Sequence, residues 1–233
     1  TRILIDQLLD DGHNFTYFTI DISKKYLTQI VNKFNHELCR LKMIALNADY
    51  INGLKWLTEH SKDRNLVLFL GSSIGNFSHE DTHIFLKNIC QDLQDGDYFL
   101  IGFDLRKDID ILLNAYNDSD GITRQFNLNL LTRINKELGG TFNLDQFKHH
   151  GIYNVSQGAM ESYLISLKDQ DVYIDALNKS FHFEAYEPIH LEYSYKYSMS
   201  QITDFAQSNG FTIIENFFDE KKFFVNSLWR ITK

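Results

Sequence analysis

Short apolar runs alternate with helical patterns through the first 105 residues, and this alternation constrains the fold more than any other feature of the sequence. Strands that alternate with helices are typical of a parallel sheet with helices on both of its faces. The run at 66–70 is continuously apolar, which fits a strand buried on both sides. We therefore predict an α/β fold, with strands at 15–21, 43–49, 65–70 and 95–105 and helices at 1–9, 23–38 and 78–93, and with a further helix between 49 and 65.

The helix expected at 23–38 carries an ordinary start signal. Ser23 precedes the helical pattern, and a serine side chain can accept a hydrogen bond from a free N–H group of the first turn. Apolar side chains then recur at the spacing of an amphipathic helix. These side chains are Tyr26, Ile30, Val31 and Phe34.

The pattern changes in the middle of the chain and returns at its end. A helix at 200–208 and two strand-like runs at 211–219 and 223–232 predict an antiparallel hairpin at the edge of the sheet. The intervening residues contain a helix around 127–138 and several strand-like pieces, namely ESYLISL, VYI, FHFEAY and IHLEYSY. We expect an inserted α+β cap over the carboxyl edge of the sheet, where ligands bind in such folds. The predicted domains are 1–118 with 196–233, and the insert 119–195.

The charge of the chain excludes some partners. It has 23 Lys and Arg against 31 Asp and Glu, a net charge of −8, so no basic excess is present to neutralise phosphates. We therefore expect no nucleic acid and no membrane as partner, and the longest apolar runs are only strand-sized. Cys39 and Cys90 lack a CxxC partner, and as buried or half-buried thiols they favour the reducing cytoplasm. His149 and His150 lack a third ligand at metal spacing, so we expect a loop pair and no metal site.

Two acids follow successive predicted strands. An acid at the end of such a strand commonly accepts from both ribose hydroxyls of a nucleotide cofactor. Asp21 holds this position, and at the next strand Asp49 could accept from an adenine amino group while Tyr50 stacks on the ring. Each acid could equally cap the helix that follows it, and for either acid alone the two interpretations have similar weight. Their occurrence on successive strands, beside a glycine turn on the next, favours a nucleoside site.

The glycine turn GSSIGN, from Gly71 to Asn76, follows the third strand. Glycine permits close approach of a ligand to the backbone, and Asn76 offers both a donor and an acceptor. The turn lacks the Lys-Ser/Thr of a Walker loop and the spacing of a GxGxxG motif. By pattern alone, an ordinary strand-to-helix turn is the more common explanation.

Glu192 and Ser194 are separated by one residue in IHLEYSY. On a strand, side chains at i and i+2 point to the same face. An acid and a hydroxyl on one face could bind a ring with two nitrogens, such as imidazole. A solvent-exposed face of an amphipathic strand explains the same pattern, and by pattern alone it is favoured two to one.

Several separated blocks resemble the histidine-specific S-adenosylmethionine-dependent methyltransferases. The best-known member of this family trimethylates the α-amino group of histidine on the way to ergothioneine. The resemblance extends over nearly the whole chain and implies a Rossmann-like class I methyltransferase sheet. The blocks are FLGSSIGNF, LIGFDLRKD, AYNDSDGITRQFNLNLLTRINKELGG and the EYS of IHLEYSY.

The resemblance assigns roles to the residues singled out above. S-adenosylmethionine would be the methyl donor, with no metal, and an amino acid would be the small-molecule substrate. Asp21 would bind the cofactor ribose, and Asp49 with Tyr50 would hold its adenine. The substrate's carboxylate and amino end would bind Asn76 and Tyr116, the two residues implied in catalysis. The remaining implied contacts are Gly71, beside cofactor and substrate, and Glu192 and Ser194 on the imidazole.

The family pattern bears on two further positions, one that departs from it and one at the start of the chain that matches it. Ser162 occupies a place on the substrate pocket wall where the family commonly has methionine, so the identity of the substrate side chain stays open. Thr1-Arg2 resemble the end of a Lys-Thr-Arg helix start in the family. We therefore expect the first sheet strand, the cofactor's glycine loop and an N-terminal helical segment to precede this chain.

Three functions thus remain beside histidine N-methylation. The same chemistry could act on another amino acid or amine. A non-catalytic protein could bind an adenosyl ligand without turnover. A nicotinamide dehydrogenase fits the acid-ended strands but not the glycine turn. For the methyltransferase we expect a cytoplasmic monomer.

Overall fold

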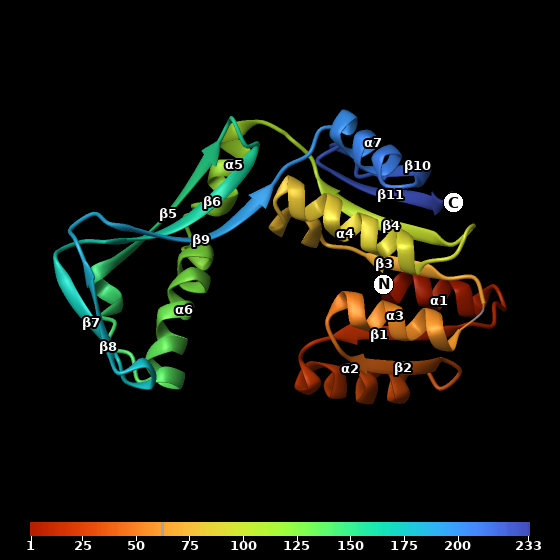
Figure 1. Cartoon of the computed structure of the whole chain (residues 1–233), viewed down its shortest axis with the longest axis horizontal. Helices are drawn as coiled ribbons and strands as arrows, with labels where there is room; N and C mark the ends of the chain where they lie inside the picture. The colour runs from red at the N-terminus through yellow and green to blue at the C-terminus, as the bar shows by residue number, and fades with distance from the viewer. Residues whose placement is uncertain (62) are drawn as a thin grey trace. The chain divides into compact units, whose positions relative to one another are not determined.

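The computed structural model describes residues 1–61 and 63–233 (Figure 1). Their contacts separate into two compact units. Unit 1 comprises Thr1–Asn65 and Lys87–Gln94, and unit 2 comprises Leu66–Leu86 and Asp95–Lys233. The helix α4 (His79–Asp92) contributes its first part to unit 2 and its second part to unit 1.

Unit 1 contains a two-stranded parallel sheet with helices on both faces. Tyr17 of β1 packs against Phe34 of α2, with ring centroids 6.1 Å apart. Ile20 points to the opposite face of β1 and lies directly against Gly53 of α3, so closely that a Cβ at Gly53 would stand 2.5 Å from its side chain. The bounds are α1 Arg2–Asp10, β1 Thr16–Asp21, α2 Lys24–Glu37, β2 Lys42–Asn47 and α3 Tyr50–His60.

The cap of α2 is confirmed, but one of its predicted apolar positions is wrong. The Ser23 side chain accepts from the backbone N–H of Tyr26 at 3.3 Å. The Tyr26 side chain itself is 50% exposed, and Leu27 is buried in its place. Residues 27, 30, 31 and 34 have helical spacing, as do the predicted residues 26, 30, 31 and 34. The two faces differ only in the first turn of the helix, where position 27 and not position 26 is buried.

Unit 2 is built on a four-stranded sheet of order β10-β11-β4-β3. β3 and β4 are parallel, whereas β11 is antiparallel to both β4 and β10, which confirms the predicted hairpin. An aromatic core covers one face of this sheet, where Trp229 and Tyr197 are fully buried and Phe205 of α7 packs on Tyr197. The bounds are β3 Leu66–Phe69, η1 Ser73–Asn76, β4 Tyr98–Asp104, α7 Met199–Ser208, β10 Phe211–Phe218 and β11 Phe224–Ile231.

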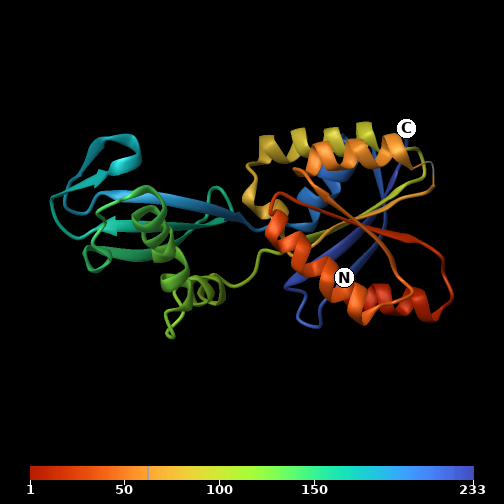
Figure 2. The same ribbon diagram turned by 90° about the horizontal axis from the view of Figure 1, so that it is seen from below.

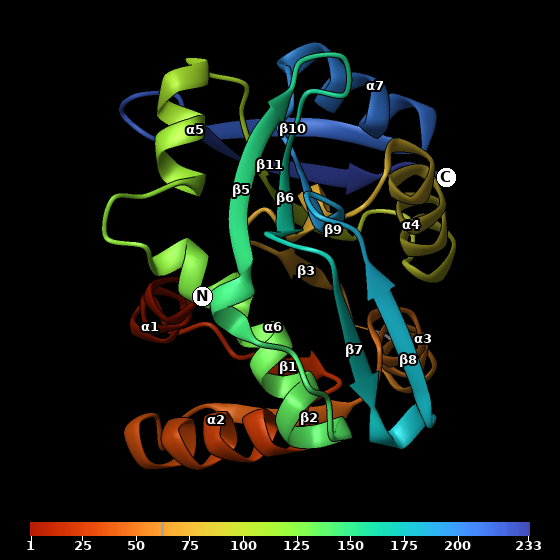
Figure 3. The same cartoon turned by 90° about the vertical axis from the view of Figure 1, so that its left-hand side faces the viewer.

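The middle of the chain forms its own sheets, as predicted. A three-stranded antiparallel sheet of order β5-β6-β9 carries α5 and α6, which both pack on β5 (Figure 3). A separate hairpin, β7–β8, closes an apolar core that includes Leu131 and Phe147. Strand β9 then leads back toward α7 (Figure 2). The bounds are α5 Ile109–Tyr116, α6 Ile122–Leu138, η2 Leu144–Gln146, β5 Phe147–Asn154, β6 Ala159–Ser166, β7 Gln170–Ile174, η3 Asp175–Leu177, β8 Lys179–Phe183 and β9 Pro188–Tyr195.

The α/β class is thus confirmed, with three local corrections. Cys39 lies in an exposed turn and not in a helix, because α2 ends at Glu37. His149 and His150 belong to strand β5 and not to a loop. Helix α6 begins at Ile122, five residues before the expected start. The predicted boundaries of the insert at 119 and 195 stay a prediction.

Asp118 holds the start of α6. Its carboxylate accepts from the backbone N–H groups of Ile122 at 2.7 Å and Thr123 at 2.9 Å. Hydrogen bonds from the Thr123 side chain and backbone lower the pKa of Asp118 from 3.8 to about 2. A carboxyl whose pKa is depressed on folding stabilises the fold above its unfolded pKa, and this contribution disappears as the pH falls toward the folded pKa.

We therefore expect Asp118→Asn to be less stable than the wild type near neutral pH, with a difference that shrinks as the pH falls below about 4. Urea unfolding of both proteins at a series of pH values measures this difference. A gap that stays constant into the acid range would show that the charge of Asp118 does not stabilise α6.

Candidate active site

Asp21 and Asp49 lie together in unit 1. They line one hollow with Ile22 and Tyr50, at the ends of β1 and β2. Each acid also makes the local capping bond that was the alternative interpretation. Asp21 Oδ1 accepts from the backbone N–H of Ser23 at 2.7 Å, and Asp49 Oδ1 accepts from the backbone N–H of Asn52 at 2.9 Å. Both carboxylates retain oxygen lone pairs toward the hollow, so capping and ligand binding are compatible.

Asp49 is held as an anion. Hydrogen bonds from the backbone N–H and the side chain of Asn52 keep the pKa of this carboxyl below its ordinary value. Tyr50 follows directly and its side chain is 48% exposed at the hollow. The hollow therefore presents an ionised hydrogen-bond acceptor beside an accessible aromatic ring.

The glycine turn belongs to unit 2 and has a special backbone. Gly71 and Ser72 both adopt left-handed conformations, with φ of 75° and 58°. Gly75 lies so close to β9 that a Cβ there would stand 3.1 Å from the carbonyl oxygen of Tyr195. The hydroxyl of Tyr197 donates to the carbonyl of Ile74 at 3.0 Å. The turn is thereby fixed against the end of β9, with Gly71 and Asn76 exposed at its two ends.

The predicted pair on β9 shares one face, as expected. Glu192 is paired in register with Ser162 of β6, and Ser194 with Met160. The Ser162 hydroxyl donates to Glu192 Oε1 at 3.4 Å. The bulge in this strand pair falls beyond Glu192, so the alternation between Glu192 and Ser194 is regular. Ser162, predicted on the pocket wall, thus contacts the predicted imidazole-binding acid.

Tyr116 joins the same face from the end of α5. Its hydroxyl donates to Ser194 Oγ at 2.7 Å. Its carbonyl oxygen lies 2.8 Å from His149 Nε2, and the side-chain nitrogen of Asn127 lies 3.1 Å from His149 Nδ1. With the Asn127 amide donating to Nδ1, the proton of His149 resides on Nε2 and bonds the Tyr116 carbonyl. The buried His149 is therefore a support for Tyr116.

The neighbouring residue is held in the same way. Asn117 pairs with Gly151 of β5 through two bonds, from its Nδ2 to the Gly151 carbonyl at 2.9 Å and from the Gly151 N–H to its Oδ1 at 2.8 Å. A Cβ at Gly151 would stand 3.2 Å from the Asn117 amide and 3.3 Å from Tyr116 Cβ. The absence of a side chain at Gly151 thus permits the position of Tyr116.

The catalytic role predicted for Tyr116 implies that Gly151→Ala lowers turnover by about tenfold, because the added methyl would displace Tyr116. The thermal midpoint should fall by only a few degrees, since the added methyl requires shifts of tenths of an ångström. Steady-state kinetics and a melting curve on the same preparation separate the two effects. Unchanged turnover would contradict a role of Tyr116 at the site.

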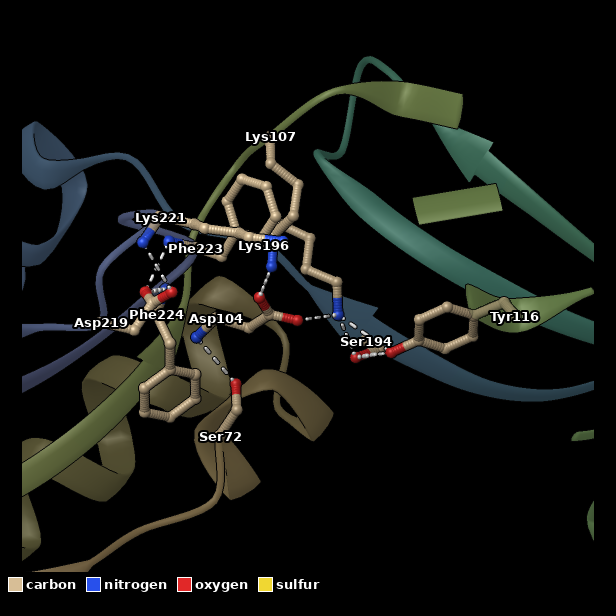
Figure 4. A network of polar contacts seen from close by, with 10 residues as sticks. All are labelled: Ser72, Asp104, Lys107, Tyr116, Ser194, Lys196, Asp219, Lys221, Phe223 and Phe224. Atoms are coloured by element: carbon tan, nitrogen blue, oxygen red, sulfur yellow. Dashed lines mark hydrogen bonds and ion pairs between the residues drawn. The ribbon is translucent and has the colours of Figure 1, made fainter. Parts of the chain in front are cut away.

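Lys196 was not predicted from the sequence as part of this site. Lys196 follows Ser194 on the same side of the strand and its side chain is only 1% exposed. Its Nζ lies 2.7 Å from Ser194 Oγ, 2.9 Å from the Tyr116 hydroxyl and 3.0 Å from Asp104 Oδ2 (Figure 4). The Nζ also lies 5.0 Å from the centre of the Tyr116 ring. A buried ammonium group therefore connects two predicted substrate contacts to an acid at the end of β4.

Asp104 also connects this network to the glycine turn. Lys107 Nζ bonds Asp104 Oδ1 at 2.5 Å, so that two ammonium groups share one carboxylate. The backbone N–H of Asp104 donates to Ser72 Oγ at 3.1 Å. Figure 4 shows these side chains converging where β4, β9 and the turn meet. Asp104 thus ends β4 just as Asp21 ends β1.

The residues predicted from the sequence therefore form two groups. Unit 1 contains the predicted cofactor contacts Asp21, Asp49 and Tyr50. Unit 2 contains the predicted substrate contacts, of which Tyr116 bonds Ser194 and Ser162 bonds Glu192. Gly71 and Asn76 lie in the turn that packs on the same strand, β9.

Lys196 and Asp104 each had a sequence signal. Glu192, Ser194 and Lys196 form the pattern E-x-S-x-K, whose i, i+2 spacing places side chains on one face of a strand, and Lys196 directly follows the last residue of β9. Asp104 ends a strand just as Asp21 does.

Within 1–61 and 63–233, no three or more His, Cys, Asp or Glu side chains are placed to hold a metal ion. None of the helices in these ranges has the length and apolar character needed to cross a membrane.

Comparison with known proteins agrees with the motifs. The chain is 32% identical over 197 residues to the histidine N-alpha-methyltransferase of Mycolicibacterium smegmatis, which covers 84% of this chain and 61% of that protein. It is 30% identical over 208 residues to ergothioneine biosynthesis protein 1 of Neurospora crassa, covering 86% of this chain and 23% of that protein. It is 29% identical over 216 residues to a 4-dimethylallyltryptophan N-methyltransferase of Claviceps fusiformis, covering 83% of this chain and 60% of that protein.

The chain thus spans less than two thirds of the length of each of these relatives. A model of the histidine-specific, S-adenosylmethionine-dependent methyltransferases matches residues 1–231. The resemblance carried by the glycine turn, the segment around Tyr116 and the E-Y-S triplet is therefore confirmed, and the chain belongs to this methyltransferase family.

Proposed function

We propose that the full-length protein transfers methyl groups from S-adenosylmethionine to the α-amino nitrogen of L-histidine, up to the trimethylated betaine. The observation that carries this proposal is the shared face of Glu192 and Ser194, next to the hydroxyl of Tyr116. A carboxylate and a hydroxyl about 6.6 Å apart along a strand can bond the two nitrogens of an imidazole ring from opposite sides. The names of the M. smegmatis and N. crassa relatives support the same substrate.

The cofactor contacts are proposed on the same basis. When bound, S-adenosylmethionine supplies an electrophilic methyl group on a sulfonium. Asp21 would accept from the ribose hydroxyls, and Asp49 with Tyr50 would hold the adenine at the hollow that they line. Gly71 leaves room for close approach, since no atom outside its neighbouring residues lies within 4 Å of a Cβ built there.

The chemical task of the substrate residues is to orient the amine. Methyl transfer by in-line displacement needs the nitrogen lone pair close to the methyl carbon and aligned with it, and orientation of this kind contributes about 7–11 kcal/mol in the best cases. Asn76, in the glycine turn, would bond the carboxylate of the substrate. Tyr116, at the end of α5, would approach the amino end of the substrate. His149 and Asn117 hold Tyr116 in place by bonding at the end of that helix.

The proposal is tested by incubating the full-length protein with S-adenosylmethionine and histidine, followed by mass spectrometry with fragmentation. We expect products that carry one or more methyl groups on the α-nitrogen and none on the ring. Consumption of S-adenosylmethionine without formation of methylated histidine would overturn the proposal. The order in which the products appear shows how many methyl groups the enzyme adds.

A second candidate is the same chemistry on another amino acid. Ser162 is fully buried and bonded to Glu192, and a serine leaves more room there than the methionine common in the family. The Claviceps relative is named for a substituted tryptophan, which needs such room. Turnover of a larger amino acid in preference to histidine in the same assay would favour this candidate. Cofactor binding by calorimetry without turnover of any amino acid would instead favour a non-catalytic adenosyl-binding protein.

A further inference from the structure

Lys196 uses all of its hydrogen-bond donors inside the protein. An ammonium group has three N–H donors and no acceptor. The three acceptors that surround Nζ are Asp104 Oδ2, the Tyr116 hydroxyl oxygen and Ser194 Oγ. Because the side chain is 1% exposed, water does not compete for these donors. The Lys196 ammonium group therefore occupies one acceptor position on the hydroxyl oxygen of Tyr116 and one on that of Ser194.

Ser194 is restricted most strongly. A serine hydroxyl can accept two hydrogen bonds and donate one. Ser194 Oγ accepts from Lys196 at 2.7 Å and from the Tyr116 hydroxyl at 2.7 Å. Both of its acceptor positions are occupied, so only its proton remains for a ligand. At this site Ser194 is a donor and not an acceptor.

Glu192 has the complementary character. Its carboxylate accepts hydrogen bonds only, and Ser162 already donates to one oxygen. The other charged groups near Ser194 are arranged around Lys196: Asp104 and Lys107 from the end of β4, and Arg106, whose Nε bonds the Lys196 carbonyl at 3.3 Å. The face therefore offers a ligand one fixed donor and one fixed acceptor.

We propose that Lys196 is a positioning residue that makes Ser194 a donor, so that the site selects the neutral imidazole ring and rejects imidazolium. The neutral ring has one bare nitrogen, which accepts from Ser194, and one N–H, which donates to Glu192. Imidazolium has two N–H groups, and its second N–H would meet the Ser194 proton. This inference rests on the proposed function, because it assumes that the bound ring is that of histidine.

The wild-type protein provides the first test. Calorimetry with S-adenosylhomocysteine present measures the Kd of histidine and of 3-(1H-1,2,4-triazol-3-yl)alanine. The carbon-linked triazole ring keeps an N–H donor and a nitrogen acceptor but stays neutral in mild acid. Ionisation of the α-amine, Glu192 or Asp104 affects both ligands alike and cancels in the ratio of their Kd values. Below about pH 6.5 we expect histidine to weaken by about tenfold per pH unit relative to the triazole.

The second test removes the ammonium group. In Lys196→Met, Ser194 regains an acceptor position, so the ratio of the two Kd values should become nearly independent of pH. Lys168→Met, at an exposed lysine of the insert, is the matched control and should keep the wild-type slope. If Lys196→Met does not fold, Ser194→Ala replaces it, because loss of the donor should flatten the ratio in the same way.

The outcomes separate the two proposals. A ratio that does not depend on pH in the wild type would overturn the role of Lys196. A wild-type slope retained in Lys196→Met, or in Ser194→Ala, would do the same. If the protein binds S-adenosylhomocysteine but binds histidine at no pH, the proposed function itself fails.

Discussion

Glu192→Gln is expected to lower kcat/KM for histidine by about tenfold to a hundredfold. Glutamine keeps the size of the side chain but removes the charge, and hydrogen bonds to charged groups contribute about 1.5–3 kcal/mol. Ser162 can still donate to the amide oxygen, so the local packing at β6 and β9 is preserved. The loss should therefore appear in binding of the ring and leave cofactor affinity unchanged.

Glu184→Gln is the matched control for this variant. Glu184 is an exposed acid of the same insert, near the turn that leads into β9. It should keep wild-type kinetics. Equal kcat/KM values for Glu192→Gln and the wild type would show that Glu192 does not contact the substrate. The alternative interpretation of Glu192 and Ser194, a solvent-exposed face of an amphipathic strand, would then be favoured.

Asp104→Asn is expected to destabilise the protein by about 3–5 kcal/mol. The carboxylate pairs with both Lys196 and Lys107, whose side chains are 1% and 12% exposed. Its neutralisation leaves two ammonium groups close together with little access to water. Breaking a buried pair from one side costs more than the pair itself contributes, because the remaining charge stays desolvated.

Urea unfolding of the full-length protein measures this effect. Asp110→Asn, at an exposed acid in the first turn of α5, should stay within about 0.5 kcal/mol of the wild type. A similarly small change for Asp104→Asn would mean that the two lysines find other partners. In that case the network around Tyr116 would not depend on the end of β4.

Local patterns in the sequence predicted the α/β class and singled out most of the residues that make up the candidate site. The acids that end β1 and follow β2, the glycine turn and the i, i+2 pair on β9 are short-range features, and backbone periodicity decides where they point. The sequence does not predict strand β5, because FKHHGIYN contains histidine, lysine and glycine and lacks a regular apolar alternation. Its pairing with β6 compensates for this weak intrinsic preference.

The network around Lys196 could not be predicted in the same way. Tyr116 lies 78 positions from Ser194 and 80 from Lys196, and their bonds depend on how α5 packs on the β5-β6-β9 sheet. A lysine directly after a strand normally indicates an exposed position. Its burial here follows from Asp104, a residue 92 positions away, and no local pattern contains that information.

A competition assay tests the central claim most directly. The full-length protein is given S-adenosylmethionine with equal concentrations of histidine and tryptophan in one reaction, and the early product ratio measures the ratio of the two kcat/KM values. We predict that α-N-methylated histidine dominates, and that Glu192→Gln moves the ratio strongly toward tryptophan. A predominance of methylated tryptophan in the wild type, or a product ratio unaffected by Glu192→Gln, would contradict the assignment of this face as the site that recognises imidazole.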